Sequence, residues 1–208
     1  DVSQGLIAYD KYRGQSEEII KSRAYHFKSR DKEGLKKWLW GADVTRYKVE
    51  WNGKEYIDYC DGIANPRDPK FFQGERMLIR EITNPTVFAG ITKEELYNDP
   101  AIIIVKSNET YSVKALVGLM NSKLATYYHF NNSPKATKGA FPKILVQDVK
   151  DFPLPINLLD SILELLVDYI LLSIQRGISE LDELEDIIDA LVFELYFPQD
   201  FQSKGIEI

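Results

Sequence analysis

Two apolar helical patterns in the C-terminal part of the chain constrain its fold more than any other feature. Leu, Ile and Val recur so densely over residues 157–175 that the pattern predicts a helix buried on most sides. Gly177 then provides a stop signal. A second helix is predicted from Ser179 to Pro198, with apolar residues spaced three and four apart on one face. Two helices joined by so short a link predict an α-helical hairpin.

The longer part before this hairpin has short β-rich runs separated by Gly, Asn and Pro. Strands are predicted at residues 77–82, 101–105 and 144–146, and a β-hairpin is predicted from residues 47–51 and 56–59 around the Asn52-Gly53 turn. Helices are predicted at residues 16–22 and 112–130, and a short helix or turn at 93–98. The predicted fold is therefore α+β: a β-rich body (1–155), an α-helical hairpin (156–198) and a tail (199–208).

The charges of the chain are unevenly distributed. The net charge of −6 argues against a polyanionic partner. However, residues 1–149 hold 23 Lys+Arg and 19 Asp+Glu, whereas residues 150–208 hold 3 and 13. Between Tyr111 and Gln147 there are five lysines, interleaved with aromatics, and no Asp or Glu. This pattern favours a polyanion partner for the body, with the acidic helices facing away from it.

Several kinds of active site are excluded by the sequence. There is no Gly-rich phosphate loop, and His26, His129 and Cys60 are too far apart in sequence to predict a zinc site. No Pro-Pro dipeptide occurs, so the Asn/Asp-Pro-Pro-aromatic loop of an amino-methylating DNA enzyme is missing. We therefore expect that this chain is not a complete enzyme and holds no metal or cofactor of its own.

The cellular context is predicted from the same composition. A single cysteine precludes an internal disulfide and suits a reducing cytoplasm, which is the expected location. No apolar run is long enough, at about 18 residues, to span a membrane. The opening residues lack the features of a signal peptide, and the absence of an initiator Met leads us to expect a longer parent chain.

Six segments, in order along the chain, are more informative together than any one alone. They are VSQGLIAYDKYRGQ (2–15), KKWLWGADVTRYKVEWNGKEYIDY (36–59), FFQGERMLIREI (71–82), YSVKALVGLMNSKLATYYHF (111–130), FPKILVQDVKDFPLPI (141–156) and IIDALVFELYF (187–197). Together they resemble the TaqI-like C-terminal specificity domain. That domain is the target-recognition part of DNA adenine methyltransferases and of fused type IIG restriction-modification enzymes.

The resemblance carries expectations about both fold and function. It implies a β-helix-like body with a twisted mixed sheet, followed by the α-helical hairpin. It also implies a phage-defence role, in which this part grips double-stranded DNA and recognises a short sequence. A separate catalytic methyltransferase domain of the parent chain, with S-adenosylmethionine as its expected cofactor, would flip and methylate an adenine, with or without endonuclease activity. That catalytic half is absent from this sequence.

Candidate DNA-binding residues are cations and small polar residues in predicted loops. Arginine suits guanine edges, whereas lysines, hydroxyls and backbone amides suit phosphates. The candidates are Lys11, Arg13, Arg23, Lys28, Arg30, Arg67, Lys70, Arg76, Ser133, Lys135, Thr137, Lys138 and Lys143. Lys135 and Lys138 are the leading phosphate contacts, with the amide of Gly139 beside them, and Arg13, Arg67 and Arg76 are the candidate base contacts.

Two other interpretations stay open. The chain could be a protein-interaction or assembly domain that uses the helical hairpin as its contact surface, in which case it would oligomerise and have no affinity for DNA. It could instead be a small hydrolase centred on Cys60 or the histidines, although no neighbouring residues support such a site.

Overall fold

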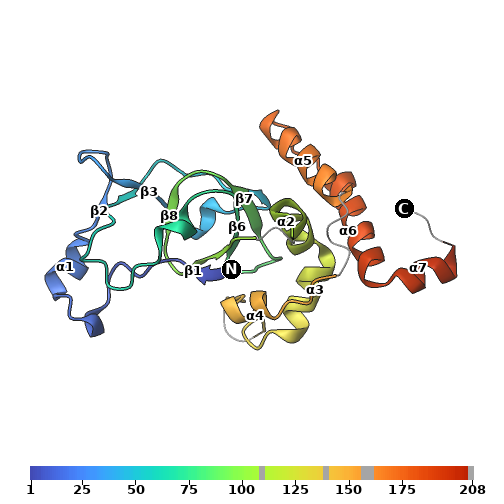
Figure 1. Cartoon of the computed structure of the whole chain (residues 1–208), viewed down its shortest axis with the longest axis horizontal. Coiled ribbons are helices and arrows are strands. Elements are labelled where there is room, and N and C mark those ends of the chain that lie inside the picture. Colours follow the sequence, from blue (N-terminus) through green and yellow to red (C-terminus); the bar gives the residue numbers. More distant parts are fainter. Residues whose placement is uncertain (108–110, 138–140, 156–161, 206–208) are drawn as a thin grey trace.

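The structure, a computed structural model, describes residues 1–107, 111–137, 141–155 and 162–205. Two β-sheets occupy one part of an elongated molecule and a group of helices occupies the other (Figure 1). The short helix α1 (Glu17–Ser22) lies at one end, and α7 (Pro198–Lys204) lies at the opposite end. Within the described ranges, no helix is long and apolar enough to cross a membrane.

The first sheet has five strands in the order β1-β9-β6-β7-β4. Their bounds are β1 Val2–Gln4, β4 Tyr47–Lys48, β6 Arg76–Arg80, β7 Ala89–Thr92 and β9 Ile102–Val105. Strand β6 pairs antiparallel with both β7 and β9, whereas β4 joins β7 in parallel. All four residues of β9 are buried, because the sheet is covered on both faces.

The second sheet is smaller and has the order β2-β5-β3-β8. Its strands are β2 His26–Phe27, β3 Lys36–Leu39, β5 Tyr56–Ile57 and β8 Leu96–Asn98. Apolar side chains from both sheets form one cluster, in which Leu78, Ile102 and Ile104 of the first sheet pack with Trp38 and Leu96 of the second. Side chains alternate between the two faces of a strand, so the other residues of β6 and β9 point to the opposite face of the first sheet.

Helices cover that other face. Met77, Ile79 and Ile103 share a cluster with α2 (Val113–Asn121), which packs against α5 (Ile162–Gln175). A Cβ at Gly118 would lie 3.0 Å from side-chain atoms of Leu163 and Val167, so the absence of a side chain there permits the close approach of the two helices. The remaining helices are α3 Lys123–Asn132, α4 Val146–Lys150 and α6 Asp182–Tyr196.

Several predicted elements are confirmed. Strands β6 and β9 and helix α1 lie where the patterns placed them. Helices α5 and α6 form the predicted hairpin, with Gly177 at φ 75° two residues after the end of α5. Residues 157–161 of the predicted first helix lie outside the described residues.

The predicted β-hairpin is wrong. A turn does form at Asn52-Gly53, where Gly53 has φ 77° and the amide of Lys54 donates to Asn52 Oδ1 (2.8 Å). However, β4 belongs to the first sheet and β5 to the second, so the two strands do not pair with each other. The described residues therefore form two open mixed sheets, and the β-helix-like body that the resemblance implied is not what they build.

Four smaller predictions also need correction. Residues 93–98 contain strand β8, and residues 144–146 hold no strand but the start of α4. The predicted helix 112–130 is two helices. Ser122 has an extended ψ of 156°, which ends α2, and its hydroxyl accepts the amide of Ala125 (3.1 Å), which caps α3. The predicted tail contains most of α7, because Pro198 begins this helix after α6 has ended at Tyr196.

Candidate nucleic-acid interface

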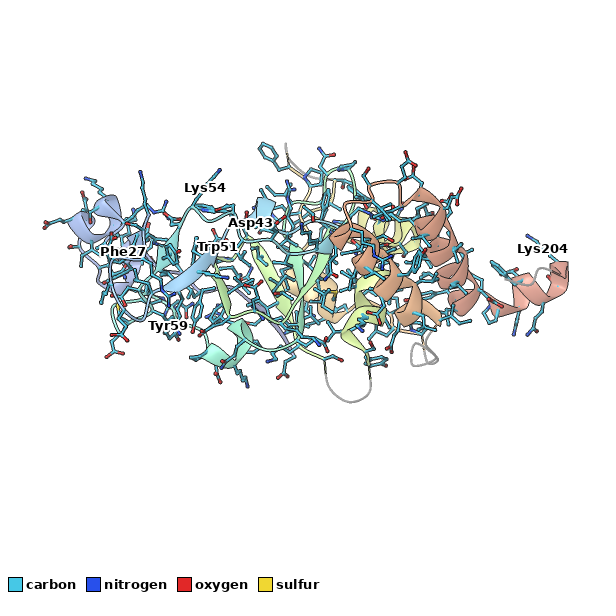
Figure 2. All side chains as sticks on the ribbon, turned by 90° about the horizontal axis from the view of Figure 1, so that it is seen from above. Phe27, Asp43, Trp51, Lys54, Tyr59 and Lys204 are labelled. Atoms are coloured by element: carbon cyan, nitrogen blue, oxygen red, sulfur yellow. The ribbon has the colours of Figure 1, made fainter. Side chains whose placement is uncertain are left out.

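The predicted DNA-binding cations fall in three places. The first is an N-terminal lobe, which we define as the turn η1 (Lys11–Arg13), α1 and the β2–β3 loop, residues 11–35. The second is the rim of a cavity beside the turn η3 (Pro69–Phe72). The third is the loop between α3 and α4. Figure 2 shows Phe27 of β2 and Lys204 of α7 near opposite ends of the molecule, so the N-terminal lobe lies far from α7, whereas α3 and the segment after α4 contact α6.

The N-terminal lobe carries five of the predicted cations. Lys11 lies 4.8 Å from the Tyr12 ring centroid, and Arg13 donates to the Ala64 carbonyl (3.3 Å). Lys28 and Arg30 are exposed and have no ion-pair partner in the described part of the chain. These two side chains are therefore free to meet an anion without breaking an existing contact.

Arg23 of the lobe is held more firmly than its neighbours. It follows α1 with φ 52°, a left-handed conformation that costs a residue with a side chain about 1–2 kcal/mol. Its guanidinium bonds Glu55 (3.0 Å) and lies 5.3 Å from the Trp40 ring centroid. Arg23 can contact a nucleic acid only from this fixed position or by giving up Glu55.

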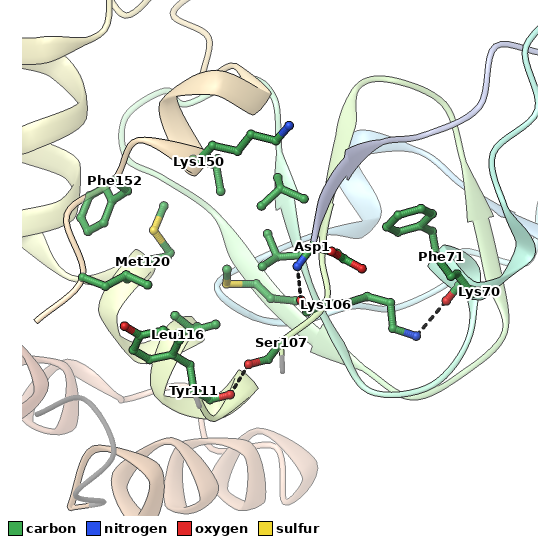
Figure 3. Close-up of a pocket in the computed structure, with 15 residues that line it drawn as sticks. Asp1, Lys70, Phe71, Lys106, Ser107, Tyr111, Leu116, Met120, Lys150 and Phe152 are labelled. Atoms are coloured by element: carbon green, nitrogen blue, oxygen red, sulfur yellow. Dashed lines mark hydrogen bonds between the residues drawn. The ribbon is translucent and has the colours of Figure 1, made fainter. Parts of the chain in front are cut away.

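A cavity of about 570 Å³ lies between η3, the end of β9, α2 and α4 (Figure 3). Its floor is apolar, with Met77, Val105, Leu116, Met120 and Phe152. Lys70, Lys106 and Lys150 line it, and we call it the lysine cavity. The Lys106 ammonium donates to the carbonyls of Lys70 (2.8 Å) and Gln73 (2.9 Å), whereas Lys150 is exposed.

Sequence reasoning found Lys70 but missed Lys106 and Lys150. Lys106 directly follows the buried strand β9, and Lys150 is the last residue of α4. Neither belongs to a basic cluster in the sequence. They share only their position at the end of a strand or helix that reaches the same cavity. Their convergence depends on tertiary packing that no local pattern shows.

The α3–α4 loop exposes Lys135 and Thr137. Lys143 is half-buried and pairs with Glu81 (3.0 Å), while its amide donates to the Lys135 carbonyl (3.2 Å) and closes the loop. Lys138 and Gly139 lie outside the described residues. The Tyr128 ring packs edge-on against Phe152 at a centroid distance of 5.1 Å and supports the loop from below.

Ser133 is not a phosphate donor in this structure. It is 6% exposed, and its hydroxyl donates to the Asp148 carboxylate (2.8 Å). That carboxylate also accepts the amide of Leu145 (2.8 Å), so Ser133 and Asp148 together fix the loop against the start of α4. A phosphate contact by this hydroxyl, as predicted, would require it to leave Asp148 and become exposed.

Arg76, a predicted base contact, is buried and bonded in this structure. It is 0% exposed and donates to the carbonyls of Gly74 (2.8 Å), Glu94 (2.9 Å) and Leu96 (3.2 Å). Burial lowers the pKa of its guanidinium to about 10. Arg67 is half-buried and bonds Asn65 Oδ1 (2.8 Å), so it stays closer to the surface than Arg76.

The lysine run between Tyr111 and Gln147 does not form one cationic surface. Three of its lysines pair with carboxylates distant in sequence: Lys114 with Asp168 (2.7 Å), Lys123 with Asp186 (2.7 Å) and Asp189 (3.0 Å), and Lys143 with Glu81. Of the described lysines in the run, Lys135 alone has no such partner. The acidic helices therefore neutralise part of the body that carries them.

The His, Cys, Asp and Glu side chains bear on whether the interface holds a metal. In the described ranges, no group of three or more His, Cys, Asp or Glu side chains is arranged to hold a metal ion. The buried His129 bonds Thr83 through Nε2 (3.0 Å), and burial lowers its pKa. A hydroxyl-bonded core histidine of this kind is a packing feature.

Comparison with known proteins decides the family. The model of the TaqI-like C-terminal specificity domain matches residues 36–154, more than half of the chain. The chain belongs to this family. The resemblance drawn from the six sequence segments is thereby confirmed, and the role of a target-recognition domain of restriction-modification enzymes, with the DNA specificity that the family implies, follows from membership.

Relatives of this specificity domain are much longer proteins. A protein of Methanocaldococcus jannaschii named "Putative type II restriction enzyme and methyltransferase RM.MjaORFECS2P" is 27% identical over 177 residues, which are 78% of this chain and 14% of the relative. The type IIL restriction-modification enzyme MmeI, solved in complex with DNA, has the same fold with a TM-score of 0.64 at 12% identity. That match covers 94% of this chain and 32% of the other. The specificity domain thus spans a minor part of each protein.

Proposed function

We propose that this specificity domain binds double-stranded DNA and recognises a short sequence in it for a DNA adenine methyltransferase or a fused restriction-modification enzyme. The contact surface is formed by the N-terminal lobe, the lysine cavity and the α3–α4 loop. Catalysis, with S-adenosylmethionine as cofactor, belongs to a separate domain of the parent protein. Family membership and the distribution of unpaired cations support this proposal.

The observation that carries the proposal is a set of exposed cations that have no ion-pair partner among the described residues. Lys28, Arg30, Lys135 and Lys150 are exposed and unpaired within the described ranges, and all precede the acidic helices α5 and α6. Such unpaired cations can meet phosphates without first breaking an ion pair, whereas the exposed carboxylates of α6 would repel a duplex. Phosphate contacts by such cations supply most of the affinity and orient the protein, while base edges supply specificity.

Roles are assigned by accessibility. Lys28, Lys70, Lys135 and Lys150 are the phosphate contacts, with the hydroxyl of Thr137. Lys138, which lies outside the described residues, keeps this role from the sequence alone. Arg13 and Arg67 remain as the candidate base contacts, because a guanidinium can bond guanine O6 and N7 together. Arg76 and Ser133 are excluded as contacts by their burial.

Reversing the charge of Lys135 and Lys138 together tests the α3–α4 loop. We expect the Lys135→Glu/Lys138→Glu variant to bind a duplex about tenfold more weakly or worse, with a salt dependence that is lower by about two phosphate contacts. Fluorescence anisotropy over a series of salt concentrations measures both quantities. The matched control is Lys204→Glu, an exposed lysine of α7 outside the proposed surface, which should bind like the wild type. Equal affinity of the double variant and the wild type would remove the loop from the interface.

A second candidate function, docking of a partner domain, is favoured by an exposed stripe on α5. Ile162, Leu165, Tyr169 and Leu172 are 60%, 68%, 59% and 42% exposed, and their spacing of three, four and three places them on one face. A helix that is apolar on all sides is normally buried. Exposed carboxylates on the neighbouring α6 would oppose a second copy of this acidic hairpin, so the catalytic domain of the parent is the favoured occupant.

Light scattering on the chain separates the two functions. We expect a monomer that binds duplex DNA, and a Leu165→Glu/Tyr169→Glu variant with unchanged affinity for DNA, because the stripe lies far from the proposed surface. A stable oligomer that binds no DNA, and that dissociates in this variant, would instead show that assembly is the function of the chain.

A further inference from the structure

A small aromatic pocket of about 240 Å³ lies where the segment after β1 meets the end of α1, strand β3 and the β8–β9 turn. The lining residues that matter are Tyr9, Arg23, His26, Trp38, Trp40 and Asp99. Pockets for drug-sized ligands occupy about 300–1,000 Å³, so this one has room for a single planar ring system. It adjoins the N-terminal lobe, and no role described so far uses it.

Hydrogen bonding fixes which atoms of this pocket are donors. The amide of Tyr25 donates to the Tyr9 hydroxyl oxygen (2.8 Å), and that hydroxyl lies 2.8 Å from His26 Nδ1. The hydroxyl proton is best placed toward Nδ1, because the oxygen already accepts from Tyr25. Burial, with a smaller contribution from Arg23, lowers the pKa of His26 to about 4, so the ring is neutral. With the Tyr9 proton directed to Nδ1, we assign the ring proton to Nε2.

Two ring N–H groups of the pocket residues then have no acceptor. His26 Nε2 and Trp38 Nε1 are both buried without a hydrogen-bond partner in the described part of the chain, and Trp38 is 2% exposed. A buried donor without a partner costs about 1–3 kcal/mol. Four other buried polar atoms of the described residues also lack a partner, so what points to a ligand here is that two such donors belong to residues lining one pocket. Trp51, by contrast, donates its ring N–H to the Glu55 carbonyl (3.1 Å).

The remaining pocket residues narrow the chemistry of the ligand. Trp40, 37% exposed, offers an indole face, and Arg23 lies above it as a further donor. Asp99 brings a carboxylate that accepts the amide of Ala101 (2.9 Å), and burial raises its pKa. That carboxylate disfavours a purely anionic ligand, and the unpaired N–H donors disfavour an aliphatic one. A planar ring with both acceptors and donors on its edge matches every group.

We propose that this pocket binds a single unstacked nucleobase. The proposal rests on the DNA-binding function inferred above if the base comes from DNA, and stands apart from it if the base comes from a free nucleoside. The base stacks on Trp40 and accepts hydrogen bonds from His26 and Trp38, while Asp99 accepts from an exocyclic amino group. A base held here gives the specificity domain a contact with one nucleotide that groove contacts alone do not provide.

Indole ¹H–¹⁵N spectra of the chain test the pocket directly. Thymidine, deoxyadenosine, deoxycytidine and deoxyguanosine are the probes. At least one nucleoside is expected to shift the Trp38 signal saturably and leave the Trp51 signal in place. Trp38→Phe, which keeps an aromatic ring but removes the N–H, should weaken binding by about tenfold or more. Trp40→Ala at the exposed rim provides a second variant that does not disturb the core, and Trp51→Phe is the matched control.

A duplex with one extrahelical base distinguishes DNA from a free nucleoside as the source. If the chain binds the duplex with the extrahelical base more tightly than the fully paired duplex, and Trp38→Phe and Trp40→Ala abolish this difference, the pocket binds a base of DNA. Binding of nucleosides without any duplex affinity supports the pocket and overturns the DNA proposal. Duplex affinity with no saturable shift by any nucleoside and no preference for the extrahelical base overturns the pocket and leaves the DNA proposal standing.

Discussion

Replacing Arg76 with Met is expected to destabilise the domain by about 3 kcal/mol or more, since each unpaired buried acceptor costs about 1–3 kcal/mol. The side chain is fully buried and its guanidinium bonds the carbonyls of Gly74, Glu94 and Leu96. Met has a similar length but no donor, so these carbonyls would lose their partner. Urea unfolding measures the change. For a domain of this size, the midpoint temperature of thermal unfolding should fall by about 6–12 °C.

Arg67→Met is the matched control. Arg67 is half-buried and bonds Asn65 at the surface, so its loss should change the free energy of unfolding by less than about 1 kcal/mol. The Arg76 variant should also lose DNA affinity only to the extent that it unfolds. A stable Arg76→Met protein with wild-type unfolding and lost DNA binding would contradict the structural role and restore Arg76 as a base contact.

Reversing four exposed cations together should produce the largest change in DNA affinity. The variant Lys28→Glu/Arg30→Glu/Lys70→Glu/Lys150→Glu removes charge from both the N-terminal lobe and the lysine cavity. We expect duplex affinity to fall by about 100-fold or more near physiological salt, because each phosphate contact releases counterions and the new carboxylates repel the backbone. Fluorescence anisotropy with a duplex of random sequence measures this sequence-independent part of binding.

The control for this variant reverses charge at the opposite end. Arg176→Glu/Lys204→Glu changes two exposed cations of the acidic helical region. Its affinity should stay within about twofold of the wild type, because charges beyond a Debye length of about 10 Å are screened. Comparable losses per charge in the two variants would mean that net charge alone, and not a defined surface, governs binding.

Elements with strong local periodicity could be predicted from the sequence, and their pairing could not. The α5–Gly177–α6 hairpin and strands β6 and β9 are set by apolar spacing and by one glycine, all of which lie within a short window. The turn at Asn52-Gly53 was also recognised. The partners of β4 and β5 are β7 and β3, which lie far away in sequence, so a local turn signal could not assign the two strands to different sheets.

The sequence indicated that the candidate surface would carry positive charge, but it could not show which residues form that surface. Lys114 and Lys123 belong to the basic run in the sequence, yet their partners Asp168, Asp186 and Asp189 come from the acidic helices. Arg76 resembles a loop cation in FFQGERMLIREI, but it begins β6 and is buried. Burial and ion pairing depend on tertiary contacts. The order of the motifs, which carried the resemblance to the family, can be read from the sequence alone.

The salt dependence of duplex binding tests the central claim most directly. If the N-terminal lobe, the lysine cavity and the α3–α4 loop lie along the phosphate backbone, the logarithm of the association constant should fall against the logarithm of salt with a slope of about −4 or steeper, near −0.9 for each phosphate. The four-site variant keeps Lys135 and Lys138 of the α3–α4 loop, so it should reduce that slope to about −2. A wild-type chain whose binding to duplex DNA is absent, or does not respond to salt, would contradict the account.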